Sequence, residues 1–348
     1  MMGKQNGFER FQEWLEAIGA EMRACLAEVS PGLVPFYGMM AYHLGWQDAL
    51  WRPVRQREGK RLRPLLCLLA SEAAGGSWRK ALPPAAAVEL LHDFTLIHDD
   101  VEDNSPLRRG RPAVWSVWGI PQAINAGDGL FVIARMALLR LRQHGLPAET
   151  ILQAVEILDR AILVICQGQY LDLSFEGSLE VDEAAYRQMI SWKTAALLEA
   201  SMHLGALVGG GSAMVVAALR AYGQALGMAF QVQDDLLGVW GEEERTGKPA
   251  AADVHGRKLG LPVVHGLAHA HGPDREILAR LYSGKGPMEG ADVAAVLGVL
   301  ERTGSRVYVE RMAASHHEQA LEGLCSLPAG PPRDALEEIA ALLLGRQS

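Results

Sequence analysis

Two apolar segments with helical periodicity, residues 88–98 and 225–237, carry closely spaced acidic residues at their ends, and this pattern constrains the fold of the chain most strongly. The first segment runs into residues 99–103 (Asp-Asp-Val-Glu-Asp), and the second contains Asp234 and Asp235. Segments this apolar pack against a core and do not form a free surface face. The sequence therefore predicts two buried helices whose carboxylates line a cavity.

The rest of the chain repeats the helical pattern. Apolar residues recur at spacings of three and four, whereas alternating Val- and Ile-rich runs bounded by hairpin turns are scarce. Because 49% of the residues are hydrophobic and only 6% are aromatic, a large core of close-packed helices is favoured over sheets. No Pro/Ser-rich linker divides the chain, so we predict an all-α protein with a single domain over residues 1–348.

Glycine and proline mark the expected helix boundaries. An amphipathic helix is predicted over residues 8–28, within an N-terminal segment of residues 1–34, and a second apolar segment ends at Leu44. The tail predicts a loop over residues 327–332 and a last helix from Ala335 to Leu344. Further breaks are expected at Pro31-Gly32, Gly75-Gly76, residues 145–147, residues 209–211 and Gly272-Pro273.

Charge and cysteine content exclude several classes of protein. A net charge of −8 without a basic stripe disfavours nucleic acid as a partner. The four cysteines have no CxxC spacing, so we expect buried free thiols and neither a zinc site nor a disulfide scaffold. The start of the chain lacks a hydrophobic signal region, and no charge-free stretch is long enough to cross a bilayer. We therefore expect a cytoplasmic protein without a transmembrane segment.

The acidic residues have the spacing of a site for hard cations. Asp99 and Asp103 are four residues apart and project together from a helix, with Asp100 beside them, so their charges repel unless a cation intervenes. Mg²⁺ fits because it binds through one or two carboxylates together with the oxygens of a substrate phosphate. An acidic helical pair alone is more often a solvated face, but here the flanking segments are apolar. The candidate metal ligands are Asp99, Asp100, Asp103, Asp234 and Asp235.

Three basic clusters lie next to apolar segments, at residues 59–64 (Gly-Lys-Arg-Leu-Arg-Pro), 108–110 (Arg-Arg-Gly) and 192–194 (Trp-Lys-Thr). Arg offers bidentate donors to phosphate oxygens, and Lys offers a point charge. Taken alone, each cluster is more simply interpreted as charged residues in a solvated loop. Together with the acidic segments, they indicate recognition of an anion such as a diphosphate.

With these motifs in this order, the chain resembles the trans-isoprenyl diphosphate synthases of the polyprenyl synthetase family, in particular those that make geranylgeranyl diphosphate, over residues 35–265. The matching stretches are residues 59–64, His92 ahead of residues 99–103, residues 108–110, Gly127-Asp128, Gly168-Gln169, Lys193-Thr194, residues 230–235 and Thr246-Gly247-Lys248. The resemblance implies a helical bundle around a deep central cavity, with the acidic motifs on opposite walls, and a homodimer.

The resemblance also implies roles for individual residues. Isopentenyl diphosphate would be bound by Lys60, Arg63, His92 and Arg109. The allylic diphosphate would be bound by Arg108, Lys193, Lys248 and Lys258, with Thr194 accompanying Lys193, and Gln231 would lie beside the reacting carbons. His92 precedes Asp99 by seven residues, so helix geometry places it on the same face and about 10 Å away along the axis. Taken alone, His92 reads as an ordinary core histidine.

The implied chemistry is a Mg²⁺-assisted ionisation. The C1–O bond of dimethylallyl, geranyl or farnesyl diphosphate breaks, and isopentenyl diphosphate attacks the allylic cation through its double bond. A proton is then lost, which in the family is attributed to the released diphosphate acting as base. The sequence contains no nucleophile elbow, Walker motif or dinucleotide fingerprint that would indicate other chemistry.

The chain departs from the family pattern at three positions. Gly238 stands where most members have the third Asp of the second acidic motif, Glu58 replaces a common glycine, and Gly260 replaces a common Thr. The missing Asp predicts reduced or rearranged metal coordination. The family's chain-length positions are Phe94 and Thr95, and the bulky ring of Phe94 favours a C20 product over C15, although Phe94 also reads as ordinary core.

Two other readings remain open. A class I terpene cyclase shares the helical fold and an Asp-rich motif but consumes a single allylic diphosphate, so it would not need Lys60, Arg63 and His92 together. A non-catalytic partner subunit of a prenyl synthase is supported only by Gly238, and the intact first acidic motif argues against it.

Overall fold

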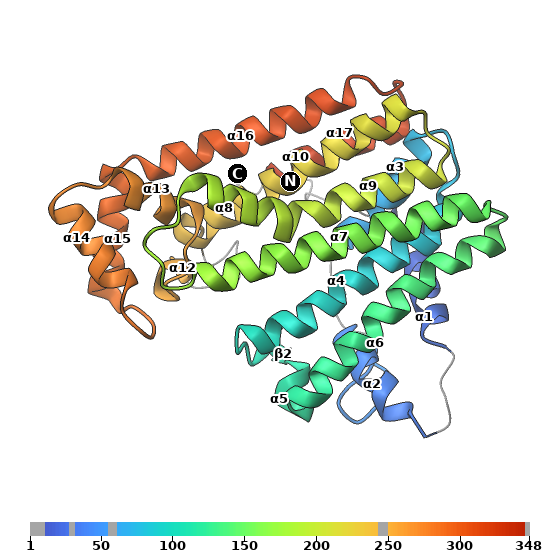
Figure 1. Ribbon diagram of the computed structural model, residues 1–348, viewed down its shortest axis with the longest axis horizontal. Helices are drawn as coiled ribbons and strands as arrows, with labels where there is room; N and C mark the ends of the chain where they lie inside the picture. The colour runs from blue at the N-terminus through green and yellow to red at the C-terminus, as the bar shows by residue number, and fades with distance from the viewer. Residues whose placement is uncertain (1–10, 28–31, 55–60, 243–249, 345–348) are drawn as a thin grey trace, which may run out of the picture. The chain divides into compact units, whose positions relative to one another are not determined.

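The computed structural model describes residues 11–27, 32–54, 61–242 and 250–344, and helices dominate them (Figure 1). The described chain forms two compact units. Unit 1 comprises residues 1–159 and 201–216, and unit 2 comprises residues 160–200 and 217–348. The boundaries fall inside three helices rather than in linkers. The all-α prediction is confirmed, and the prediction of one domain over residues 1–348 stays a prediction.

Unit 1 is a set of helices with one short hairpin. Its elements are α1 (Gln12–Cys25), α2 (Val34–His43), α3 (Leu62–Ala73), the 3₁₀ helix η2 (Trp78–Ala81), α4 (Leu82–Glu102), β1 (Leu107–Arg108), β2 (Arg111–Pro112), α5 (Val114–Trp118), α6 (Ile120–Leu139), the 3₁₀ helix η3 (Arg140–His144) and the first part of α7 (Ala148–Phe175). Helix α4 packs along α6 and also contacts α3 and α1. It is therefore the central helix of this unit.

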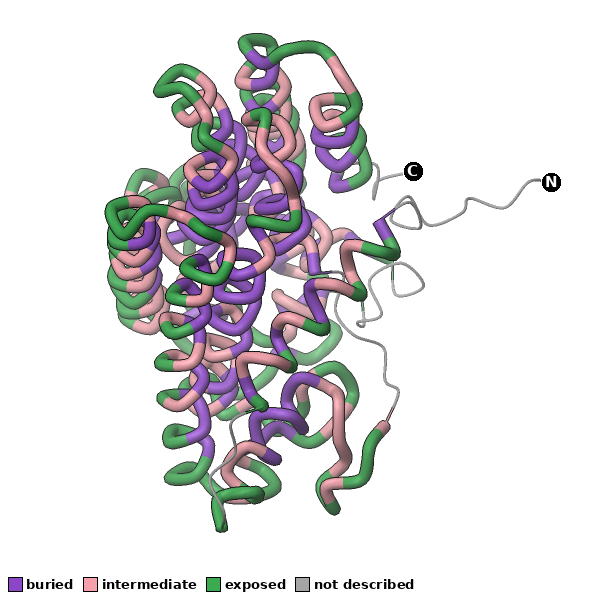
Figure 2. The backbone as a smooth tube through the Cα atoms, turned by 90° about the vertical axis from the view of Figure 1, so that its right-hand side faces the viewer, coloured by how far each residue is buried: buried purple, intermediate pink, exposed green. Residues whose placement is uncertain are grey.

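Small residues allow α4 to occupy the core. Its first turn holds Pro83 and Pro84, which are tolerated there because the first backbone N–H groups of a helix have no partner within it. Ala85, Ala86 and Ala87 follow and are fully buried. Buried residues lie along the helix faces that meet other helices, whereas exposed residues gather at the outer turns and loops (Figure 2). The acidic residues 99–103 are thus carried on the C-terminal end of a core helix.

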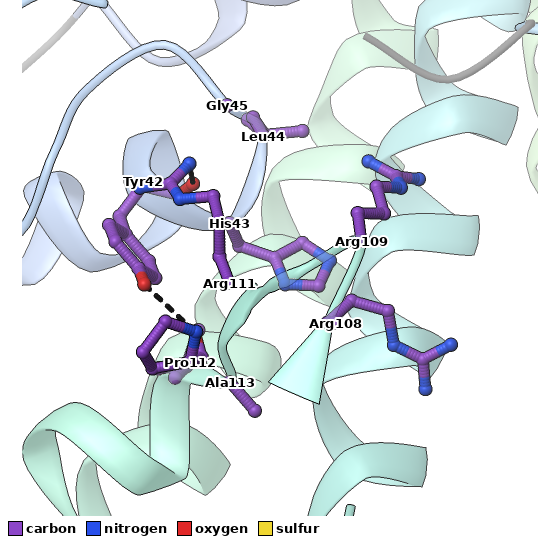
Figure 3. A pocket seen from close by; sticks show the side chains of 10 residues that line it. Tyr42, His43, Leu44, Gly45, Arg108, Arg109, Arg111, Pro112 and Ala113 are labelled. Atoms are coloured by element: carbon purple, nitrogen blue, oxygen red, sulfur yellow. Dashed lines mark hydrogen bonds between the residues drawn. The ribbon is translucent and has the colours of Figure 1, made fainter. Parts of the chain in front are cut away.

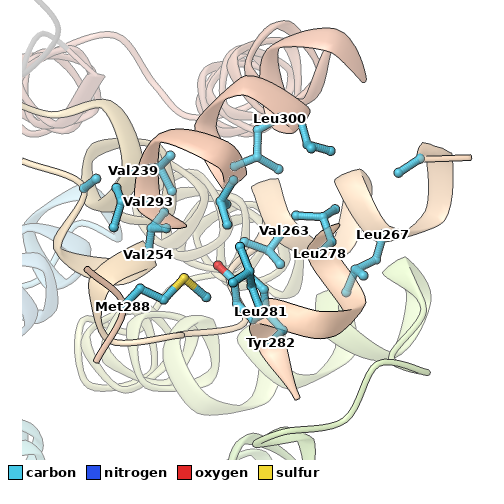
Figure 4. Close-up of a cluster of buried hydrophobic side chains, with 14 residues drawn as sticks. Val239, Val254, Val263, Leu267, Leu278, Leu281, Tyr282, Met288, Val293 and Leu300 are labelled. Atoms are coloured by element: carbon cyan, nitrogen blue, oxygen red, sulfur yellow. The ribbon is translucent and has the colours of Figure 1, made fainter. Parts of the chain in front are cut away.

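Unit 2 is also helical. Its elements are the second part of α7, α8 (Glu183–Ile190), the π-helical turn η4 (Ser191–Ala195), α9 (Ala196–Val208, shared with unit 1), α10 (Ala213–Trp240, largely in unit 2), α12 (Ala252–His255), α13 (Leu261–His269), α14 (Pro273–Tyr282), α15 (Gly290–Arg302), α16 (Ser305–Leu324) and α17 (Pro331–Leu344). One of its cores is formed by α10, α12, α13, α14 and α15, with Val239, Val254 and Leu300 among the buried side chains (Figure 4).

Helix α10 is long and apolar enough, by length and composition alone, to cross a membrane, which the sequence did not suggest. Its side chains nevertheless take part in a protein core, where Met228, Val232 and Leu236 pack with residues of α8 and α13. The helix also carries Asp234 and Asp235 near its C-terminal end. Core helices of soluble proteins pass the same test, and we interpret α10 as one.

The helix boundaries differ modestly from those predicted. The first helix begins at Gln12 and ends at Cys25, inside the predicted range 8–28, whose first residues lie outside the described part. The last helix begins at Pro331, four residues before the predicted start at Ala335, because its two prolines occupy the first helical turn rather than a loop.

The expectation of buried thiols is correct only for Cys67. Cys25 is half-buried, and Cys166 and Cys325 are exposed. None of the four cysteines, all of which lie within the described residues, forms a disulfide.

Candidate active site

The first acidic motif occupies the C-terminal end of α4, where the partial negative charge of the helix dipole adds to that of the carboxylates. Asp99 and Asp103 are one helical turn apart, since the Asp103 N–H donates to the Asp99 carbonyl at 2.9 Å. Asp100 is buried, and its Oδ2 atom has no hydrogen-bond partner. Carboxylates gathered this closely repel one another and require cationic partners.

Arg108 is the protein's own counter-ion to this motif. It lies in the hairpin after α4, and its Nε donates to Asp100 Oδ1 at 2.8 Å, while its Nη2 lies 3.4 Å from Asp99 Oδ2. Burial disfavours the charged guanidinium, but the attraction of Asp100, Asp99 and Asp103 outweighs it and raises the pKa of Arg108. The structure thus brings together four residues that the sequence analysis assigned to substrate and metal binding.

Arg63 and His92, which the family resemblance assigns to the same diphosphate, lie in contact. Arg63 Nη1 lies 3.2 Å from His92 Nε2, and because a guanidinium can only donate, Nε2 must accept. Burial and, secondarily, the nearby Arg63 lower the pKa of His92 well below its usual value, so the ring is neutral. The remaining proton is then on Nδ1, so the neutral ring can still donate one hydrogen bond.

A tight turn presents Arg109. Arg108 pairs with Arg111 across the hairpin, and the two turn residues, Arg109 and Gly110, have φ values of 52° and 76°. Two residues with positive φ define a type I′ turn, which suits glycine but is uncommon for arginine. Behind this hairpin lies a pocket of about 290 Å³ whose lining includes His43 and the arginines 108, 109 and 111. The guanidinium groups of Arg108 and Arg109 point in opposite directions (Figure 3).

Phe94 and Thr95, the predicted chain-length residues, lie one turn before the acidic motif. The Phe94 ring packs against the His98 ring at 4.9 Å and the Phe131 ring of α6 at 5.4 Å, between ring centroids. Thr95 Oγ1 donates to the His92 carbonyl at 2.7 Å, so its hydroxyl is satisfied by its own helix. Phe94 therefore sits in an aromatic cluster that connects α4 to α6.

The second acidic motif centres on a hydrogen-bonded chain in unit 2. Thr194 Oγ1 donates to Gln231 Oε1 at 2.8 Å, and Gln231 Nε2 donates to Asp235 Oδ1 at 3.1 Å. Asp235 Oδ2 accepts from the Tyr186 hydroxyl at 2.5 Å and from the Leu261 N–H at 3.2 Å. Asp235 is only 1% exposed. With three donors and no solvent access, Asp235 is suited to positioning Gln231 rather than to the direct metal ligation expected from the sequence.

Lys193 lies in the π-helical turn η4, a local geometry that is frequent at functional sites. Its Nζ donates to Asp172 Oδ2 of α7 at 2.5 Å. The two backbones come together because position 168 is glycine: a Cβ there would overlap the backbone of Lys193. The Gly168-Gln169 motif thus serves the close packing of α7 on η4, and Asp172, one turn further along α7, pairs with the lysine.

Lys258 lies among carboxylates. Its Nζ is 3.5 Å from Asp253 Oδ2. Burial disfavours its charge, but Asp235, Asp253, Asp234 and Asp172 together outweigh that effect and raise the pKa of Lys258. Unit 2 therefore gathers two lysines and four carboxylates.

Asp253 also explains the unusual Gly238. A Cβ at position 238 would overlap the Asp253 carboxylate, so the space next to α10 that a side chain at 238 would occupy is already filled by an acidic group.

Lys60, Glu58 and Lys248 lie outside the described residues.

Sequence reasoning missed several residues of these clusters. Asp172 could have been predicted, because it follows Gln169 by three residues on the same helix. Tyr186 and Asp253 gave no local signal, since each reaches its partner from another element of the fold. Among the described residues, no group of three His, Cys, Asp or Glu side chains is arranged to hold a metal ion by itself.

Comparison with known proteins identifies the family. Residues 46–300 match the family model described as Polyprenyl synthetase. The chain belongs to the polyprenyl synthetase family. This polyprenyl synthetase is 43% identical, over 83% of its length and 87% of the relative's, to the "Short chain isoprenyl diphosphate synthase" of Methanothermobacter thermautotrophicus. It is 36% identical, over 96% of its length and 91% of the relative's, to the "(2E,6E)-farnesyl diphosphate synthase" of Mycobacterium tuberculosis.

The structural comparison agrees. The fold of this polyprenyl synthetase matches the crystal structure of geranylgeranyl pyrophosphate synthetase from Pyrococcus horikoshii with a TM-score of 0.87, at 32% identity, covering 97% of this chain and 98% of the other. The predicted family and all-α isoprenoid-synthase fold are therefore confirmed, and the chain is a trans-prenyltransferase. The relatives' names span C15 and C20 products and leave the chain length open.

Proposed function

We propose that this prenyltransferase condenses isopentenyl diphosphate head-to-tail with an allylic diphosphate and releases an all-trans C20 prenyl diphosphate, in the cytoplasm. The observation that carries the proposal is the pairing of cationic and acidic groups in each unit: Arg63, His92, Arg108 and Arg109 beside one acidic motif, and Lys193 and Lys258 beside the other. A terpene cyclase binds a single diphosphate and would not need Arg63, His92 and Arg109 in addition to the cations beside the acidic residues, so this extra cationic group favours a two-substrate condensation.

In this proposal, unit 1 holds isopentenyl diphosphate through Arg63, the neutral His92 and Arg109, together with Lys60. The allylic diphosphate is held by Arg108, Lys193, Lys248 and Lys258. Thr194, Gln231 and Asp235 form a chain of hydrogen bonds that fixes the Gln231 amide beside the reacting carbons. An amide can stabilise positive charge through its dipole and is a poor nucleophile, so it suits a site where a carbocation forms.

The oxygen-rich residues fit Mg²⁺. Asp99, Asp100, Asp103 and Asp234 are the ligands we propose, and the unsatisfied buried Oδ2 of Asp100 is the structural observation that supports a cation there. Bound Mg²⁺ supplies stabilisation of the charge that develops on the leaving diphosphate. Asp253, whose carboxylate fills the space beside Gly238, provides the acidic group that the second motif otherwise lacks.

A homodimer is also part of the proposal. Helix α6 exposes a stripe of apolar side chains that Asp128 interrupts: Ile120 and Ile124 precede it and Val132, Met136 and Leu139 follow it, each 42–55% exposed. Exposed apolar side chains gathered on one helix mark an interaction surface more often than a free one. A second copy of the chain is the partner that the family resemblance implies.

Site-directed variants test the proposed function. Asp100→Asn and Lys193→Met should each lower kcat for incorporation of labelled isopentenyl diphosphate by roughly 10²–10³-fold, the usual effect of losing one group that stabilises transition-state charge. The matched control is Asp159→Asn, which breaks the exposed pair between Asp159 and Arg135 (Nε–Oδ1 2.7 Å) and should leave kcat unchanged. Full activity in either site variant would contradict the proposed site.

A further inference from the structure

The backbone of Arg109 has a left-handed conformation that is uncommon for arginine. It is the first residue of the type I′ turn, with φ 52°, and its side chain is 36% exposed. A long side chain on a two-residue turn has many rotamers open to it, and the entropy lost on ordering it opposes binding. Something must limit that freedom if Arg109 is to meet a diphosphate in one orientation.

The group that faces Arg109 is a buried carboxylate. Asp93 Oδ1 lies 3.5 Å from Arg109 Nη2, and the Asp93 side chain is only 3% exposed. Asp93 follows His92 on α4, so the same turn of the helix carries one proposed diphosphate ligand and a partner for another.

The same oxygen has a second neighbour. Asp93 Oδ1 is 3.4 Å from Nε2 of His43, at the C-terminal end of α2, and that side chain is 2% exposed. Both contacts are longer than hydrogen bonds, and neither Asp93 Oδ1 nor His43 Nε2 has a hydrogen-bond partner. The His43 ring lies between the end of α2 and the hairpin that bears Arg109 (Figure 3).

We infer that Asp93, backed by His43, is a positioning residue that orients Arg109 for the diphosphate of isopentenyl diphosphate. The inference rests on the function proposed above. A buried carboxylate attracts the guanidinium strongly because little water screens it, yet the long contact leaves the N–H groups of Arg109 able to donate to a substrate. The burial of His43 against Asp93 keeps water away from the carboxylate and preserves that attraction.

A purely structural role for Asp93 predicts something different. Asp93 also contributes to the electrostatic environment of the buried Arg63 and Glu89. If that were its whole role, its loss would lower stability without a selective effect on one substrate. The test must therefore separate binding of isopentenyl diphosphate from folding and from binding of the allylic substrate.

The experiment measures the affinity for isopentenyl diphosphate alone, by calorimetry with Mg²⁺ and no allylic primer, and the KM of both substrates. Asp93→Asn should weaken isopentenyl diphosphate binding and raise its KM by about tenfold, within the range of coupling between contacting groups, while the KM for the allylic diphosphate changes less than about twofold. His43→Gln should act in the same direction with a smaller effect, and Asp159→Asn should change neither.

A double-mutant cycle makes the test decisive. If Asp93 acts through Arg109, the double variant Asp93→Asn/Arg109→Lys binds isopentenyl diphosphate no more weakly than Arg109→Lys alone. Additive losses, or an unchanged KM in folded Asp93→Asn, would overturn the inference. If Asp93→Asn does not fold, His43→Gln and its cycle with Arg109→Lys give the same readout. Failure of the wild-type chain to condense the substrates would instead reject the proposed function.

Discussion

At the scale of single residues, the neighbourhood of Arg63 and His92 contains a buried acid with a shifted titration. Glu89 lies one turn before Asp93 on α4 and is 6% exposed. Burial and, next, the charge of Asp93 raise the pKa of Glu89 to about 7, although Arg61, Arg63 and Arg109 pull it down. The folded protein thus holds a proton on Glu89 at pH values where the unfolded chain has released it.

A pH dependence of stability follows. Because the folded pKa is above the unfolded value, Glu89 contributes stability that is present at low pH and is lost as the pH rises through about 7. The free energy of unfolding of the wild type minus that of Glu89→Gln should fall, by on the order of 2–3 kcal/mol, between pH 4.5 and 7.5 and stay flat above. Denaturant titrations across that range measure it. Glu89→Leu serves as control and should give the same pH trend, and a difference that does not vary with pH would refute the assignment.

Phe94 is the residue that we expect to limit product length. Its ring lies in the cluster with His98 and Phe131, and Phe94→Ala removes that ring. The variant should release products longer by at least one five-carbon unit, as measured by chromatography of the dephosphorylated prenols. Phe36→Ala, which removes a ring of α2 that packs against Tyr37 with centroids 5.3 Å apart, is the matched control. An unchanged product would remove Phe94 as the limiting group.

At the scale of elements, Gly238 of α10 lies against Asp253 of α12. This contact determines what effect a side chain at position 238 would have. Because a Cβ at 238 would overlap the Asp253 carboxylate, Gly238→Asp adds a clash and a like charge rather than restoring a ligand. We expect a loss of about 1–3 kcal/mol of stability and lower activity. Gly290→Asp makes the same substitution at the start of α15, where a Cβ meets no atom within 4 Å, and should shift stability by less than about 0.5 kcal/mol. Higher kcat in a stable Gly238→Asp would show that the missing Asp is a deficiency.

The elements also show where sequence reasoning reaches its limit. The helices that carry Asp99 and Asp234 were predictable, because apolar periodicity and glycine breaks are local signals. The π-helical turn at Lys193 and the hairpin turn at Arg109 were not, since neither Trp-Lys-Thr nor Arg-Gly is a turn signature of the usual Asn-Gly kind. Residue pairs such as Lys193 with Asp172, or Arg109 with Asp93, arise only when separate elements pack together.

At the scale of the whole molecule, the exposed stripe on α6 predicts self-association. The double variant Val132→Glu/Met136→Glu places charges in its middle, where both residues are at least half exposed in the single chain. The wild type should have the mass of a dimer and the variant that of a monomer by size-exclusion chromatography with light scattering. Val307→Glu, an exposed apolar residue of α16, should remain dimeric. A variant that keeps the wild-type mass would exclude α6 as the interface.

The residues proposed for the reaction are spread along the whole sequence, so the most direct test uses the intact chain. The purified protein is incubated with Mg²⁺, labelled isopentenyl diphosphate and dimethylallyl, geranyl or farnesyl diphosphate in turn, and the chain length of the labelled products is measured. We expect elongation from each primer to an all-trans C20 diphosphate, and none without an allylic primer or after the metal is removed by chelation. Absence of label in any product from folded protein, or release of a terpene hydrocarbon or alcohol from one allylic diphosphate alone, would contradict the account.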